Sequence, residues 1–108
     1  MTTGIKISYS PIFIKKAKQL KKKHQSLVND LSELESQLKY KPTTGSDLGN
    51  GVFKIRLAVK SKGKGKSGGY RVITYLHSED EITMVYIYDK SEEVTILKKD
   101  IQKIIESL

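Results

Sequence analysis

The fold of this chain is decided by the stretch from Val52 to Tyr75, which reads VFKIRLAVKSKGKGKSGGYRVITY. Two candidate β-strands in it flank a loop that consists almost entirely of Lys, Gly and Ser. In the first strand, apolar residues alternate with Lys54 and Arg56, so the apolar and cationic side chains are expected on opposite faces. The sequence therefore predicts a hairpin with one apolar face and one cationic face.

This stretch is also densely cationic, with seven Lys and Arg side chains within eighteen residues. They are Lys54, Arg56, Lys60, Lys62, Lys64, Lys66 and Arg71. The glycines and serines between the lysines allow backbone amides and ammonium groups to approach phosphates together, which suits a polyanionic ligand. A solvated hairpin loop without a ligand would have the same composition. The cationic strand face beside the loop favours the polyanion interpretation.

Composition limits the possible classes of protein. The 108 residues form one domain, residues 1–108, and a hydrophobic fraction of 37% suffices for one modest core. The net charge of +8 favours acidic partners such as nucleic acid. The chain has no cysteine, which excludes disulfides, thiolate zinc sites and cysteine nucleophiles. We find no signal peptide and no apolar run of membrane-spanning length, so we expect a cytoplasmic protein without a membrane partner.

The first part of the chain is predicted to form a strand followed by two helices. Residues Gly4–Tyr9 alternate between apolar and polar side chains, as in a half-buried strand. Ser10, followed by proline, is the expected N-cap of a helix over residues 11–23. Ser26 is the expected N-cap of a second helix, whose leucines recur at steps of four, three and four residues. These leucines are Leu27, Leu31, Leu34 and Leu38. The two helices form an αα-hairpin that packs on the sheet, and Thr43–Gly51 is predicted to be a loop.

The last part of the chain completes an α+β fold. Residues 81–88 form a strand, with Ile82, Met84 and Tyr86 on one face and Val85 and Ile87 on the other. An amphipathic helix ends the chain. The predicted order is β-α-α-β-β-β-α, an antiparallel meander sheet packed by an αα-hairpin and a C-terminal helix. The place of the first strand in the sheet stays open, and the cationic side chains of the hairpin are expected on a partly open face.

Most catalytic chemistries are absent from the sequence. His24 and His77 are isolated, and the acidic residues show no paired-carboxylate or metal-binding pattern, so neither a metal nor another cofactor is expected. The glycine-rich loop lacks the G-x-x-x-x-G-K-[ST] spacing of a nucleotide-binding loop. Cationic side chains and tyrosines remain as the available functional groups.

At these residues the chain resembles a known family. The runs FKIRLAVKSKGKGKSGGYRVITY and MVYIYDKSE are similar to the RelE/HigB toxins of bacterial type II toxin–antitoxin modules, especially the HigB-like branch with a lysine–glycine loop. The resemblance implies a RelE-like fold and a ribosome-dependent endoribonuclease that cuts mRNA and inhibits translation. It also implies a cognate antitoxin as partner, besides the ribosome and mRNA.

The resemblance assigns roles to individual residues. The basic pair of the family corresponds to Lys54 and Arg56, and its arginine after a glycine corresponds to Arg71. Family members also use an arginine and a tyrosine or histidine near the C-terminus, but no such residue follows Tyr88 here. Tyr88 and Lys90 are the nearby substitutes, which leaves the general acid and base open. The expected RNA contacts are Lys60, Lys62, Lys64, Lys66 and Tyr70.

Two other functions remain possible on the same residues. A ParE-like toxin would share the fold but act on DNA gyrase, and an RNA-binding module would retain RNA without cutting it. The cluster of Lys54, Arg56 and Arg71 favours RNA cleavage, because fixed cations stabilise the charge that develops on a phosphate.

Overall fold

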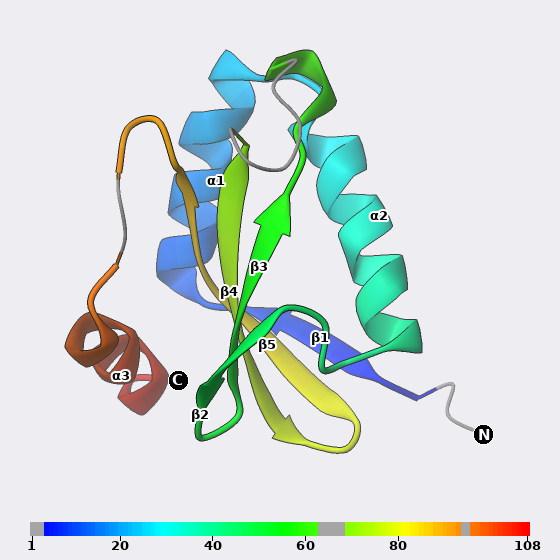
Figure 1. The fold of residues 1–108 in the computed structure, drawn as a ribbon, viewed down its shortest axis with the longest axis vertical. Helices are drawn as coiled ribbons and strands as arrows, with labels where there is room; N and C mark the ends of the chain where they lie inside the picture. The colour runs from blue at the N-terminus through cyan, green and yellow to red at the C-terminus, as the bar shows by residue number, and fades with distance from the viewer. Residues whose placement is uncertain (1–3, 63–68, 94–95) are drawn as a thin grey trace.

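The structure, a computed structural model, describes residues 4–62, 69–93 and 96–108 (Figure 1). Its elements are β1 (Lys6–Tyr9), α1 (Pro11–Lys23), α2 (Leu27–Tyr40), β2 (Ser46–Gly49), β3 (Val52–Leu57), the short 3-10 helix η1 (Lys60–Lys62), β4 (Tyr70–Ser78), β5 (Glu81–Asp89) and α3 (Lys98–Glu106). The sheet has the order β1-β5-β4-β3-β2. Strands β2 to β5 are antiparallel, and β1 pairs in parallel with β5. The predicted α+β fold is confirmed.

Strand β2 was not expected, because Thr43–Gly51 reads as a loop. Residues 46–49 instead pair with the start of β3. The turn between them uses Asn50 and Gly51, with φ of 55° and 81°. Two consecutive positive φ values are typical of a two-residue hairpin turn, for which Asn-Gly is the preferred sequence. The prediction of a loop was therefore wrong for β2, and the Asn-Gly pair is the signal that could have revealed it.

The N-termini of the two helices differ from each other. Ser10 is the N-cap of α1, as predicted: its Oγ accepts a hydrogen bond from Phe13 N at 3.0 Å. The same hydroxyl donates to Val85 O at 2.6 Å, which fixes α1 to β5. Ser26 is the N-cap position of α2, as predicted, but it has helical backbone angles and its side chain makes no capping hydrogen bond. Its Oγ donates instead to Asp30 Oδ2 at 2.7 Å.

Helices α1 and α2 cover one face of the sheet (Figure 1). The main core lies between them and the sheet, where Phe13 and Leu20 of α1 meet Leu27, Leu34 and Leu38 of α2. The strands contribute their own apolar side chains to this core, namely Ile55, Leu57, Val72, Ile82, Met84 and Ile87. The helical hairpin therefore packs on the sheet, as its leucine spacing indicated.

Helix α3 covers part of the opposite face. Its Ile101 is buried against Val52, Ile73 and Val85 in a second, smaller core. Figure 1 shows α3 near the β2 end of the sheet, and side chains of α3 and the β2–β3 turn line a common surface there. The rest of this face lies beyond the α3 core, and the cationic side chains of β3 project from it. Among the described residues, no helix is long and apolar enough to cross a membrane.

A β-bulge in β5 changes the faces of its side chains. Ile73 pairs with Tyr86, whereas the next residue, Thr74, pairs with Met84, so Val85 is an extra residue. Val85 and Tyr86 consequently both belong to the α3 side of the sheet, while Met84 belongs to the α1–α2 side. The prediction that Tyr86 shares a face with Met84 was therefore wrong, because strict alternation does not hold across a bulge.

Candidate functional site

Three of the predicted site residues form a row across adjacent strands. In the sheet register Arg56 of β3 pairs with Arg71 of β4, and Arg71 pairs with Tyr88 of β5. Side chains of directly paired residues lie on the same face of a sheet. We call Arg56, Arg71 and Tyr88 the cationic row. The bulge at Val85 makes this row possible, since without it Tyr88 would share a face with Met84.

The members of the cationic row differ in exposure. Arg71 is only 5% exposed, and its Nη1 donates a hydrogen bond to Tyr70 O at 3.2 Å. Tyr88 is fully buried, at 0%. Arg56, in contrast, is exposed to solvent. The row therefore combines a fixed guanidinium and a fixed phenol with a guanidinium that is free to move toward a ligand.

The arrangement of the two arginines favours an anion. Like charges that lie directly opposite each other on paired strands destabilise a sheet. Arg56 and Arg71 occupy directly paired positions of β3 and β4. A phosphate between the two guanidinium groups would accept hydrogen bonds from both of them.

The hydroxyl of Tyr88 is the second unusual feature of the row. It is buried and has no hydrogen-bond partner among the residues that the structure describes. A buried polar group without a partner typically costs about 1–3 kcal/mol of stability. Such groups call for an explanation, and a catalytic role is one of the established ones.

Lys54 lies next to the cationic row on the same face. It is two residues before Arg56 in β3, which corresponds to about 7 Å along a strand. It pairs with Ile73, and Ile73 pairs with Tyr86. Lys54 is half-buried. Three of the predicted cations, Lys54, Arg56 and Arg71, therefore share one face of the sheet, as the alternation in β3 indicated.

The remaining predicted cations are less closely grouped. Lys90 follows β5, is exposed, and donates its backbone N–H to Gly69 O at 3.2 Å. Lys60 is exposed, and its Nζ lies 3.2 Å from Glu33 Oε1 on α2. The backbone of Lys62 belongs to η1. The other two predicted loop contacts, Lys64 and Lys66, lie outside the described residues.

Tyr70 is not on this face. It is fully buried in the core beneath α1 and α2, and its hydroxyl is 2.6 Å from Nδ1 of His24. Burial, together with the charge of Asp89, raises the pKa of Tyr70 to about 12. In this position its ring has no surface for a nucleotide, so the prediction of an RNA contact is corrected to a structural role.

A polar network at the edge of β5 was missed by the sequence interpretation. Lys16 Nζ donates to Tyr86 Oη at 3.0 Å and to Glu93 Oε1 at 2.8 Å, and Tyr86 Oη donates to Glu93 Oε2 at 2.9 Å. Burial lowers the pKa of Lys16, but the hydrogen bonds to Glu93 and Tyr86 outweigh it and raise the pKa above its ordinary value. Burial and Glu93 raise the pKa of Tyr86. The network fixes the segment after β5 to α1, and no local pattern in the sequence indicates it.

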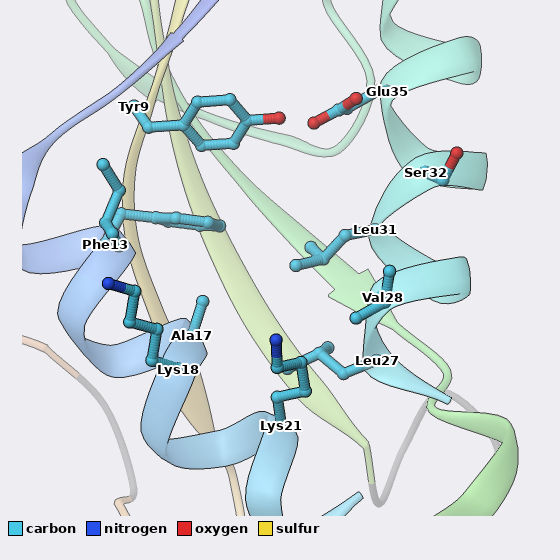
Figure 2. Close-up of a pocket in the computed structure, with 11 residues that line it drawn as sticks. Tyr9, Phe13, Ala17, Lys18, Lys21, Leu27, Val28, Leu31, Ser32 and Glu35 are labelled. Atoms are coloured by element: carbon cyan, nitrogen blue, oxygen red, sulfur yellow. The ribbon is translucent and has the colours of Figure 1, made fainter. Parts of the chain in front are cut away.

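A groove lies between α1 and α2 on the other side of the molecule (Figure 2). It has a volume of about 430 Å³ and an apolar lining that includes Phe13, Ile14, Ala17, Leu27, Val28 and Leu31. Ile14 and Val28 are 45% and 54% exposed, which is unusual for a pair of large apolar side chains at one hollow. Figure 2 shows Lys18 and Lys21 on the α1 side of the groove and Glu35 on the α2 side.

The described residues contain no group of three or more His, Cys, Asp or Glu side chains that could hold a metal ion. The positive charges described at the site belong to Arg and Lys side chains. Together with Tyr88, these side chains can bind a phosphate and supply hydrogen-bond donors to it.

Comparison with known proteins identifies the family of the chain. The model of the family described as the RelE toxin of the RelE/RelB toxin–antitoxin system matches residues 5–107. A search of curated proteins found no match. The family match covers nearly the whole chain, including every element of the sheet and the cationic row. The chain therefore belongs to the RelE family of toxins from toxin–antitoxin systems.

Proposed function

We propose that this toxin is a ribosome-dependent endoribonuclease that cuts mRNA without a catalytic metal and thereby inhibits translation. The observation that carries the proposal is the cationic row, in which Arg56 pairs with Arg71 and Tyr88 holds a buried hydroxyl without a hydrogen-bond partner in the described part of the chain. Family membership supports the general role of a toxin in a toxin–antitoxin system. The proposed target also implies that the toxin acts in the cytoplasm, where ribosomes translate mRNA.

The chemistry follows from the substrate. The 2′-OH of RNA attacks the adjacent phosphorus, the bond from phosphorus to the 5′-oxygen breaks, and the leaving oxygen takes up a proton. Arg56 and Arg71 stabilise the negative charge that develops on the phosphate. Lys54, on the same face, accepts the proton of the 2′-OH when its amine is uncharged, and Tyr88, whose buried hydroxyl must first become accessible in the complex, donates a proton to the leaving 5′-oxygen. Lys90 stays a second candidate for the proton donor.

The ribosome has a separate task in this proposal. In-line attack requires the 2′-oxygen, the phosphorus and the leaving oxygen to be aligned, and a ribosome that holds the mRNA supplies this orientation. Lys60 and Lys62 then contact phosphates of ribosomal or messenger RNA, together with Lys64 and Lys66. Such contacts contribute affinity that decreases as the salt concentration rises.

The end groups of the cleaved mRNA test the mechanism. Attack by the 2′-OH leaves a 2′,3′-cyclic phosphate or a 3′-phosphate on the upstream fragment, and we expect one of these on mRNA cleaved by the purified toxin on ribosomes. Chelation of magnesium is not a usable test, because ribosomes require magnesium. A 3′-hydroxyl on the upstream fragment would indicate attack by water and would contradict the proposal. Supercoiling of plasmid DNA by gyrase in the presence of the toxin is the control for a ParE-like activity, and we expect no change in it.

The cognate antitoxin that the family implies needs a binding surface on the toxin. We propose that the groove between α1 and α2 binds an amphipathic helix of the antitoxin. Ile14 and Val28 offer exposed apolar surface, and Lys18 and Lys21 offer positive charge for acidic residues on the rim of such a helix. The net charge of +8 favours an acidic partner for the toxin as a whole.

The variant Val28→Gln tests this binding site. Calorimetry with the product of the neighbouring gene is expected to show binding about tenfold weaker than to the parent, since one large apolar contact is lost. Ser36→Gln, an exposed position of α2 that does not line the groove, is the matched control and should bind like the parent. Equal affinities of the two variants would show that the antitoxin binds elsewhere, for example over the cationic row.

A further inference from the structure

The lysine-rich segment that connects β3 to β4 in the sequence is called the cationic loop here. A cluster of hydrogen bonds joins its start to helix α2. It consists of Ser26 and Asp30 at the beginning of α2 and of Lys60 and Ser61 in η1, and we call these four residues the joint cluster. The two pairs are about thirty residues apart in the sequence but in direct contact in the fold. The cluster lies beside α2, where Asp30 and Lys60 line one hollow together with Arg56 of the cationic row.

Asp30 is the centre of the joint cluster. It is a carboxylate that is only 3% exposed. Its Oδ2 accepts hydrogen bonds from Ser26 Oγ at 2.7 Å and from the backbone N–H of Lys60 at 3.2 Å. One buried carboxylate oxygen therefore connects a helix to the backbone of the turn that opens the cationic loop.

The two serines strengthen the same connection. Ser61 N donates to Ser26 Oγ at 2.8 Å, and Ser26 N donates to Ser61 Oγ at 3.2 Å. The two hydroxyl oxygens are also within hydrogen-bond distance of each other, at 2.9 Å. Because each serine accepts from the backbone of the other, the position of η1 relative to α2 is fixed from both sides.

The other described end of the loop is held by the same part of the molecule. Tyr70 follows Gly69, and its hydroxyl is 2.6 Å from Nδ1 of His24, the residue that ends α1. Gly69 O accepts the backbone N–H of Lys90 at 3.2 Å. Both described ends of the cationic loop are thus held near the junction of α1 and α2, one through Asp30 and the other through His24.

We propose that Asp30 is a positioning residue for RNA binding. It holds the backbone of η1 in place, so that Lys60 and Lys62 do not have to be ordered when an RNA phosphate is bound. The inference rests on the proposed function, which it deepens by assigning the control of RNA affinity to a residue that does not contact RNA. Fixing the backbone of a residue on binding costs free energy, and a turn that is fixed beforehand avoids this cost.

The direction in which RNA affinity changes when Asp30 is replaced distinguishes a positioning role from a purely electrostatic effect. Removal of a negative charge near a site for a polyanion should strengthen RNA binding. Removal of the group that positions the turn should weaken it. Glu33 is the matched control, because it contacts the side chain of the same residue, Lys60, but not the backbone of η1. The ion pair between Lys60 and Glu33 is exposed, and such pairs contribute little to stability.

The experiment compares Asp30→Ala, Asp30→Asn and Glu33→Gln with the parent at a temperature at which all four are folded. We measure the dissociation constant for programmed ribosomes and the rate of cleavage at saturating toxin. Asp30→Ala should bind about tenfold more weakly than the parent, at an unchanged saturating rate. Asp30→Asn retains an oxygen acceptor and should bind within about threefold of the parent. Glu33→Gln should bind as well as the parent or better.

Amide hydrogen exchange in the free toxin provides a readout that does not depend on the ribosome. The amides of Lys60 and Ser61 should lose protection in Asp30→Ala and keep it in Glu33→Gln. If Asp30→Ala binds ribosomes as tightly as the parent, or loses binding and saturating rate together, the positioning role is wrong. If the parent itself does not bind ribosomes, the proposed function fails, and the role of Asp30 in RNA binding fails with it, whatever the exchange data show.

Discussion

Replacing Arg71 with alanine is expected to slow mRNA cleavage on the ribosome about 100- to 1000-fold, the usual cost of losing one fixed donor to a developing charge. Arg71 is the buried arginine of the cationic row, and Tyr70 O accepts a hydrogen bond from its Nη1. A guanidinium held in this way needs little reorganisation when the phosphate becomes more negative. Single-turnover cleavage on programmed ribosomes measures the rate, and a binding assay with the same ribosomes should give a dissociation constant near that of the parent.

Two variants serve as controls for Arg71→Ala. Arg71→Lys keeps the charge but loses the planar pair of donors, so its rate should lie between those of the parent and the alanine variant. Lys62→Ala should show the opposite pattern, with a weaker and less salt-dependent affinity and an almost unchanged saturating rate. The melting temperature of each variant shows whether it is folded in the assay. A folded Arg71→Ala variant that cleaves like the parent would remove Arg71 from the catalytic site.

The second large effect on the cleavage rate is expected for Tyr88→Phe. This substitution should lower activity without lowering stability. The hydroxyl that this substitution removes is buried and has no hydrogen-bond partner among the described residues. Its removal should leave the free energy of unfolding unchanged or raise it by about 1 kcal/mol, because an unpaired buried polar group is eliminated. Cleavage should nevertheless fall by about 100- to 10,000-fold, the range of a lost general acid. Denaturant unfolding and single-turnover cleavage measure the two quantities.

Tyr86→Phe is the matched control for Tyr88→Phe. Tyr86 lies two residues earlier in β5, and its hydroxyl contacts both Lys16 and Glu93. Its removal should lower the free energy of unfolding by about 1 kcal/mol, because hydrogen bonds of the folded state are lost. It should leave cleavage close to the parental rate, since this hydroxyl is engaged at the edge of the sheet. If Tyr88→Phe loses stability like Tyr86→Phe and keeps full activity, Tyr88 is a structural residue.

Much of the fold followed from local patterns in the sequence. The alternation in β3 correctly separated the apolar side chains Ile55 and Leu57 from Lys54 and Arg56. Ser10 was recognised as a helix cap because capping depends on residues within one turn. The shared face of Lys54, Arg56 and Arg71 was also predictable, since a hairpin between β3 and β4 leaves only the register to be decided.

The remaining features depend on contacts between distant parts of the chain. Tyr70 has the same local setting as a surface aromatic residue, and only its packing against His24 shows that it belongs to the core. The bulge at Val85 is fixed partly by Ser10, whose hydroxyl donates to Val85 O from the other end of the sequence. Strict alternation could not predict it, and therefore could not predict the face on which Tyr88 lies.

The parallel pairing of β1 with β5 limits when during synthesis the sheet can be completed. Lys6 pairs with Glu81, so the first strand must wait for most of the chain before it finds its partner. The cationic row has the same requirement, because Tyr88 comes from the last strand of the sheet. Such long-range pairings form late and slowly. The face that carries the cationic row is therefore incomplete in a nascent chain until β5 has been made and paired.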